Sequence, residues 1–295
     1  MREVLRRAAL STLLIGAALS SARAADMAVK APPPPPKAAV ATWTGYYAGV
    51  NIGYGIGDDP TTVSTVSGAA FPGLTPGTPI YGAPRSFSID PKGVIGGGQV
   101  GYNLQFAPSW VAGFEADIQG SGMRNQQNCI IPCGAPISTV PTGFLTFFPV
   151  TFSTLSEEHK IDWFGTVRGR FGYAAGPVLV YATGGLAYGE VNRNGNVVGQ
   201  TNFILGGTVN SFAGSYSASS TKAGWTLGGG VEGQLTTNWS VKAEYLYIDL
   251  GTTTDSFSTF YTSGFPATGQ AGLRTVTSSF RENIFRAGLN YKWGG

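Results

Sequence analysis

The sequence predicts an all-β protein, an eight-stranded antiparallel up-and-down transmembrane β-barrel with long extracellular loops. Three observations lead to this fold class. The composition is rich in glycine and poor in charge, eight segments alternate apolar and polar residues, and short and long connections alternate between those segments. Each observation is weak alone, but together they favour a closed membrane sheet.

The composition argues against an ordinary soluble domain. The 295 residues include 44 glycines and 12% aromatic residues but only 12% charged residues, whereas about a quarter is usual for charged residues in soluble domains. Glycine at this density would weaken a helical bundle, and it fits strands that approach closely or curve strongly.

The strand prediction rests on a period of two, which places apolar side chains on one face and glycine or polar side chains on the other. The clearest example is 109–120, where Trp110, Phe114 and Ile118 share one face and Glu115 and Asp117 share the other. One face suits lipid and the other suits a polar interior. The eight predicted strands are 43–56, 93–106, 109–120, 161–173, 177–190, 222–235, 238–250 and 283–293.

Connection lengths separate a barrel from a secreted sandwich, in which strands also alternate. Very short links surround Ala107-Pro108, Ala174-Ala175-Gly176 and Thr236-Thr237, and the other four links each exceed about 30 residues. Short periplasmic turns and long external loops are typical of outer-membrane barrels, in which an even strand count returns both chain ends to the periplasm.

The N-terminal region predicts export. A basic start, an apolar run from Ala8 to Leu19 and Ala22-Arg23-Ala24 form a signal peptide over 1–24, with cleavage between Ala24 and Ala25. Residues 25–42 contain five consecutive prolines and predict an extended periplasmic linker, either a spacer or a contact to peptidoglycan. The barrel is then 43–295. Removal of the signal peptide brings the charge of +3 close to zero, so we expect no nucleic-acid partner.

The interior predicts a network of charges. An eight-stranded barrel is just wide enough for its side chains to fill, and buried opposite charges should pair because an isolated one is costly. We expect salt bridges to close the lumen and fix the strand register. In the alternative, small interior residues such as Asn51, Gln99 and Thr166 leave a narrow aqueous path, and the protein is a small porin. The charged residues that the alternation predicts to point into the lumen are Glu115, Asp117, Asp162, Arg168, Arg170, Glu232, Lys242, Glu244 and Arg286.

Tryptophans fall at the predicted strand ends, where barrels collect aromatic side chains in two girdles. The predicted girdle residues are Trp43, Trp110, Trp239 and Trp293 at the periplasmic side and Trp163 and Trp225 at the outer side. Cys129 and Cys133 lie close together in an exported chain and predict a local disulfide.

No motif predicts a catalytic, cofactor-binding or metal-binding site. Gly96-Gly97-Gly98-Gln99-Val100-Gly101 satisfies the dinucleotide pattern but lies inside a strand with no helix to follow. A second alternative is a lipid A-modifying enzyme that uses His159 near the outer rim. Ser156, Glu157 and Glu158 would then orient the imidazole.

The chain resembles the outer-membrane surface β-barrel family of alpha-proteobacteria, which is related to the transmembrane domain of outer-membrane protein A. The resemblance rests on SARAAD at 21–26, WTGYYAGVNIGYG at 43–55 and RAGLNYKW at 286–293. The chain departs from the family at its end, where Gly294 and Gly295 follow the terminal aromatic residue. The resemblance implies an outer-membrane location and the barrel-assembly machinery as a partner. We further expect contacts to outer-membrane lipids and lipopolysaccharide and a structural role in the envelope.

Overall fold

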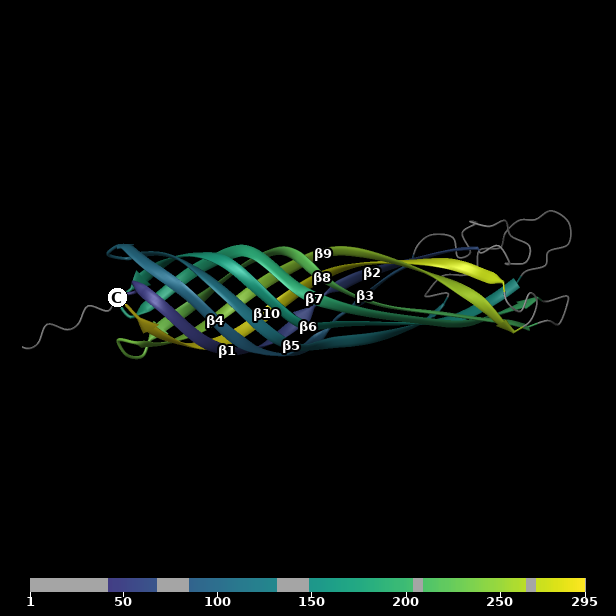
Figure 1. The fold of residues 1–295 in the computed structure, drawn as a ribbon, viewed down its shortest axis with the longest axis horizontal. Coiled ribbons are helices and arrows are strands. Elements are labelled where there is room, and N and C mark those ends of the chain that lie inside the picture. The colour runs from purple at the N-terminus through teal and green to yellow at the C-terminus, as the bar shows by residue number, and fades with distance from the viewer. Residues whose placement is uncertain (1–41, 68–84, 132–148, 204–208, 264–268, 295) are drawn as a thin grey trace, which may run out of the picture. The chain divides into compact units, whose positions relative to one another are not determined.

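The computed structural model describes residues 42–67, 85–131, 149–203, 209–263 and 269–294. Eight of its strands form a closed antiparallel ring in the order β1, β4, β5, β6, β7, β8, β9, β10, and β10 pairs with β1 to close it (Figure 1). The fold class predicted from the sequence is therefore confirmed. The ring strands are β1 (Gly45–Gly57), β4 (Lys92–Ala107), β5 (Trp110–Ile131), β6 (Pro149–Ala175), β7 (Val178–Phe203), β8 (Val209–Gln234), β9 (Trp239–Ser263) and β10 (Gln270–Trp293).

The two ends of the ring differ as the sequence predicted. Tyr46 lies opposite Trp293, so the first and last strands meet at the end that carries the short turns. The turn between β6 and β7 contains Gly176 at a φ of 60°, a left-handed conformation that glycine adopts without steric cost. At the opposite end the ring strands continue well past the predicted segments, and only residues 204–208 and 264–269 separate β7 from β8 and β9 from β10.

The outer face of the ring carries a continuous apolar belt. Every ring strand contributes large apolar side chains that are exposed, which is unusual for a soluble monomer but suits contact with lipid. Examples, one from each ring strand in order, are Ile52, Val100, Ile118, Phe171, Leu186, Leu227, Val241 and Phe285.

The strands extend far beyond the predicted lengths. Strand β6 has 27 residues and β9 has 25, so much of the sequence expected to be external loop is strand. In these extensions the apolar face turns inward, with Leu155, Val197 and Val276 buried. Many of the outward side chains are hydroxyls that pair across strands, as in Thr254 with Thr277 at 3.1 Å.

Two further strands were not predicted. Strand β2 (Asp59–Ser67) pairs with the extension of β10, and β3 (Arg85–Ile89) pairs with β2. Both lie toward the end of the ring opposite the short turns (Figure 1). Strand β2 brings Asp59 into the barrel interior toward the end opposite the short turns, which we call the upper end, and Asp59 is fully buried there.

A β-bulge at Asp162 changes which residues of β6 face inward. Pairing between β6 and β7 passes from Trp163 opposite Glu190 to Ile161 opposite Val191, which leaves Asp162 without a partner in the ladder. Because side chains alternate with a period of two, one extra residue reverses the parity. Arg168 and Arg170 point inward below the bulge, and Ile161 and His159 are buried above it.

Apolar side chains fill three levels of the interior. At the end with the short turns, Trp43 packs with Val111 and Leu179. A second cluster, which we call the apolar layer, lies at mid-height. A third cluster, which includes Leu155 and Phe257, lies in the strand extensions. The apolar layer consists of Ile95, Met123, Ile161, Phe164, Ala187, Val191, Leu246, Ile248, Leu250, Phe280 and Ile284.

The predicted signal peptide, its cleavage site at Ala24 and Ala25, and the linker up to residue 41 lie outside the described residues. The chain divides into two units, residues 1–39 and 40–295. In the described part of the chain, no helix has both the length and the apolar character needed to cross a membrane.

Candidate functional site

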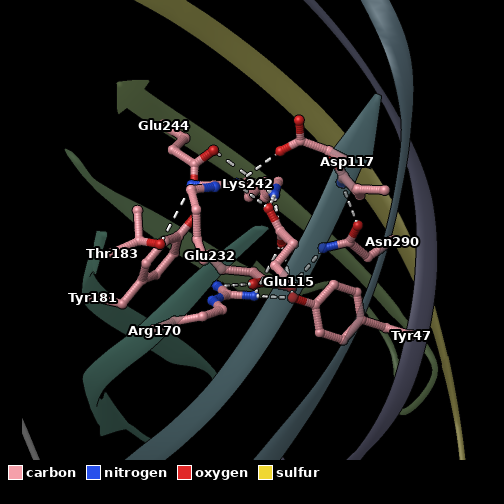
Figure 2. A network of polar contacts seen from close by, with 12 residues as sticks. Tyr47, Glu115, Asp117, Arg170, Tyr181, Thr183, Glu232, Lys242, Glu244 and Asn290 are labelled. Atoms are coloured by element: carbon pink, nitrogen blue, oxygen red, sulfur yellow. Dashed lines mark hydrogen bonds and ion pairs between the residues drawn. The ribbon is translucent and has the colours of Figure 1, made fainter. Parts of the chain in front are cut away.

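The structure brings eight of the nine predicted lumen charges together inside the barrel, between the apolar layer and the end with the short turns (Figure 2). Four are carboxylates and four are cations, so their formal charges balance, and each is at most 5% exposed. We call these eight the lumen network. They are Glu115, Asp117, Arg168, Arg170, Glu232, Lys242, Glu244 and Arg286.

Glu115 is the centre of the lumen network. Its carboxylate accepts a hydrogen bond from the Arg168 guanidinium, and the Lys242 ammonium lies 2.8 Å away. Arg286 Nη2 is 3.3 Å from Oε1, and the Tyr47 hydroxyl donates to Oε2 at 2.8 Å. Glu115 thus connects β1, β5, β6, β9 and β10.

Asp117 and Glu244 hold the two arginines from either side. Asp117 Oδ2 accepts from Arg168 at 3.0 Å and from Arg286 at 2.9 Å. Glu244 accepts from Arg168 Nη1 at 3.1 Å and from Arg286 Nε at 2.7 Å. Such charge-assisted bonds are among the stronger hydrogen bonds in proteins.

Glu232 carries the lumen network to β8 and to the polar residues beneath it. It accepts from Arg170 at 2.7 Å and from Asn290 at 2.9 Å. Asn290 accepts from Gln99 at 2.6 Å, and Gln99 accepts from Asn51 at 2.7 Å. Asn51 and Gln99, which the porin alternative assigned to an open path, instead bond to each other and are connected to the lumen network through Asn290.

Two tyrosines complete the site and were not singled out from the sequence. The Arg170 guanidinium lies 3.9 Å from the centre of the Tyr181 ring and 5.5 Å from that of Tyr47. A Cβ at Gly101 would lie 2.3 Å from the Tyr47 hydroxyl, and one at Gly230 would lie 2.7 Å from that of Tyr181. Inward glycines therefore make room for aromatic rings. Tyr47 lies four residues before Asn51 on the same strand, so the alternation of side chains could have identified it as an inward residue.

Asp162 does not belong to the lumen network, and its prediction as a lumen residue is wrong. The bulge turns its side chain to the outer face, where it is 36% exposed and lies 2.5 Å from the Lys160 ammonium. The strict alternation that predicted its inward position does not include the extra residue of a bulge.

Trp43 is 2% exposed, so its prediction as a girdle residue is wrong. It shares the inward parity of Tyr47, and its indole nitrogen donates to the Gly176 carbonyl at 3.3 Å. Trp43 covers the lumen network from the end with the short turns. A cavity of about 10 Å³ next to Trp43, Tyr47 and Glu232 has room for about one water molecule.

The other five tryptophans lie on the outer face. Trp110 stacks on Phe171 at 5.2 Å and Trp239 lies 5.1 Å from Tyr291 at the short-turn end, which Trp293 shares. At the other edge of the belt, Trp163 contacts Tyr188 and Trp225 contacts Tyr247, at 6.1 and 5.4 Å. These two levels lie at the two edges of the apolar belt.

The arrangement expected for a lipid-modifying enzyme is absent from the described residues. His159 is fully buried, and its Nδ1 lies 2.9 Å from Asp59 Oδ2. Glu157 is also buried and accepts a hydrogen bond from Tyr216, whereas Ser156 and Glu158 belong to the outer face. Because neighbouring residues of a strand face opposite ways, Ser156 and Glu158 do not orient the imidazole.

Cys129 lies on β5 and is disulfide-bonded, and its predicted partner Cys133 lies outside the described residues. Within the described ranges, no group of three or more histidine, cysteine or acidic side chains could hold a metal ion.

Comparisons with known proteins agree with the geometry. The family model for the outer membrane protein beta-barrel domain matches residues 12–292. The 31 kDa outer-membrane immunogenic protein of Brucella melitensis is 34% identical over 290 residues, which cover 93% of this chain and 94% of that protein. The 22 kDa outer membrane protein of Rhizobium leguminosarum is 36% identical over 92 residues, 31% of this chain and 35% of that protein.

Among solved structures, the outer membrane protein OprG from Pseudomonas aeruginosa matches with a TM-score of 0.36 at 14% identity, covering 85% of this chain and 97% of that chain. The family match spans nearly the whole barrel, and the relatives are outer-membrane proteins, which confirms the resemblance drawn from the sequence motifs. The chain therefore belongs to the outer membrane protein beta-barrel domain family and is a protein of the bacterial outer membrane.

Proposed function

We propose that this protein is a structural barrel with a closed lumen, which contributes to the integrity of the envelope and presents long strand hairpins at the cell surface. The observation that carries the proposal is the position of the charge-balanced lumen network between two apolar levels. Trp43 and its neighbours cover it at one end, and the apolar layer covers it at the other.

The composition of the two levels supports a closed lumen more than a conducting one. Water enters a cavity readily only where polar groups can bond to it. The carboxylates and cations of the lumen network pair with one another, while Asp117 Oδ1, Arg170 Nε and Arg286 Nη1 have no hydrogen-bond partner among the described residues. The side chains of the apolar layer offer water no polar group. A Cβ at Gly55 would lie 2.2 Å from the Met123 sulfur, so even this inward glycine leaves no open space beside it.

The lumen network also supports a role in strand register. Its side chains and their direct hydrogen-bond partners come from seven of the eight ring strands, and Gln99 on β4 is connected to them through Asn290. A slip of one residue would move a strand's charges from the interior to the lipid face. The expected partners of such a barrel are outer-membrane lipids, lipopolysaccharide, the barrel-assembly machinery and, through the linker, peptidoglycan.

A deletion strain tests the proposed function and separates it from the porin alternative. Loss of a structural barrel should raise the permeability of the outer membrane to detergents and large antibiotics, and the wild-type gene should restore the barrier. Loss of a porin should instead slow the uptake of small hydrophilic solutes. A deletion strain with normal resistance to detergents and slower solute uptake would contradict the structural role.

A further inference from the structure

Three cations lie side by side on the outer face, just beyond the apolar belt. Lys92 on β4 is directly opposite Arg124 on β5, and Arg124 is directly opposite Lys160 on β6. We call these three residues the cation row. Lys92 and Arg124 are exposed, and the Lys160 side chain is 43% exposed. The row spans two strand spacings, about 10 Å.

The cation row is unfavourable unless something outside the barrel compensates it. Like charges directly opposite each other on neighbouring strands are destabilising. Asp162 pairs with Lys160, but no described carboxylate forms an ion pair with Lys92 or Arg124. The arrangement therefore leaves two neighbouring cations available to an external anion.

The position of the cation row identifies the kind of anion. Toward the membrane, Lys92 is two residues from Val94, which is 59% exposed, and Lys160 is three residues from Trp163 of the outer girdle. The row is thus at the level where the acyl chains of the outer leaflet end and the headgroups begin. Basic side chains at this level attract anionic headgroups.

The next row of side chains away from the membrane is uncharged except for one carboxylate. Gln126, Glu158, Asn194 and Ser217 lie opposite one another across β5 to β8 and line a hollow on the outer face. Ser217 donates to Asn194 at 2.7 Å. Amides and hydroxyls both donate and accept hydrogen bonds, as sugar hydroxyls do.

We propose that the cation row binds the phosphate of a phosphorylated glycolipid of the outer leaflet, with its sugar against the polar hollow. On β5 and β6 the outer surface changes from apolar to cationic to polar, in the order of the acyl, phosphate and sugar parts of such a lipid, and the polar hollow continues onto β7 and β8. This inference rests on the outer-membrane location and does not depend on a closed lumen.

The test measures binding of lipid A to the full mature barrel refolded in phosphatidylcholine vesicles. Arg124→Gln should weaken binding of phosphorylated lipid A about fivefold, and the triple variant Lys92→Gln, Arg124→Gln, Lys160→Gln about 100-fold, at about 1 kcal/mol per basic residue. Arg281→Gln is the matched control, since Arg281 is also exposed above the belt but is paired with Asp249 at 3.7 Å. Equal losses in Arg124→Gln and Arg281→Gln would overturn the proposal.

Further measurements test whether the cation row is uncompensated and whether it binds a lipid phosphate or free phosphate. Without phosphorylated lipid, Arg124→Gln should have a thermal midpoint equal to or above that of the wild type, because it removes like-charge repulsion; a lower midpoint would contradict the uncompensated cation row. Dephosphorylated lipid A should bind about as weakly to the wild type as phosphorylated lipid A binds to the triple variant. Displacement of lipid A by millimolar inorganic phosphate would mean that the row takes free phosphate, and this too would overturn the lipid assignment.

Discussion

Glu115 interacts with every cation of the lumen network, three of them within 3.3 Å and Arg170 at 3.5 Å. In a buried setting the cost of removing one partner exceeds the value of the pair, because the other charges stay buried and uncompensated. The consequence is that a single neutral substitution at this position disturbs contacts among several strands.

Glu115→Gln should therefore lower the free energy of unfolding of the barrel by about 3–5 kcal/mol. The measurement is equilibrium unfolding in urea with the protein refolded in lipid vesicles. Glu158→Gln is the control, since it removes a carboxylate on the outer face and should change the free energy by less than about 1 kcal/mol. Similar unfolding curves for the two variants would show that the lumen network does not stabilise the barrel.

Glu157 makes the outer part of the barrel sensitive to pH. It lies six residues beyond Trp163 and therefore outside the membrane. Burial raises the pKa of the Glu157 carboxyl from 4.5 to about 7, although the hydrogen bond from Tyr216 opposes the shift. Asp255 raises this pKa further and Arg274 lowers it.

The folded state thus favours the protonated carboxyl, so the contribution of Glu157 to stability is present below pH 4.5 and is lost as the pH rises through about 7. Hydrogen exchange of the upper β6 and β7 amides should be faster, relative to the intrinsic rate, at pH 8 than at pH 5. In Glu157→Gln this difference should shrink, and in Glu158→Gln it should persist. A Glu157→Gln profile identical to the wild type would remove Glu157 as the cause.

The sequence predicted individual lumen residues well where alternation was undisturbed. It placed Glu115, Lys242 and Arg286 inward from parity alone, and the structure pairs them. It failed at Trp43, where the expectation of a girdle outweighed the parity shared with Tyr47. Partners could not be predicted, because parity gives the face of a side chain but not its height in the barrel.

The strands were predicted with correct order and short turns but not with correct length. Below the girdle of Trp163 and Trp225 the apolar face points to lipid, and above it the apolar face points inward. Phe257 is 7% exposed and Val276 is 1% exposed, although both lie in segments rich in serine and threonine. A search for apolar faces toward lipid therefore ends at the girdle and interprets the rest as loop.

The bulge at Asp162 is the feature of β6 that joins these two regions. Deletion of Asp162 should return the strand to strict alternation and place either His159 and Glu157 or Arg168 and Arg170 on the wrong face. We expect the deletion variant to lose the heat-modifiable migration of a folded barrel on gels. Asp162→Ala keeps the extra residue and should migrate as the wild type does. A folded deletion variant of wild-type stability would show that the bulge does not set the parity.

The proposed closure of the barrel as a whole rests on two kinds of side chain, the paired charges of the lumen network and the packed apolar layer. The sequence predicted the first and not the second, because the apolar layer needs side chains such as Met123 to reach into the space left by glycines on other strands. That complementarity depends on the pairing register between strands that are distant in sequence, and this register cannot be predicted from a single sequence.

The central claim is that the lumen is closed, and the most direct measurement is the ion conductance of the refolded wild-type barrel in planar lipid bilayers. We expect no steady current, and we expect Lys242→Ala alone to remain silent because the apolar layer still blocks the lumen. Addition of Phe164→Ala and Phe280→Ala to Lys242→Ala should produce a current. A reproducible steady current through the wild type would contradict the closed barrel and make this protein a small porin.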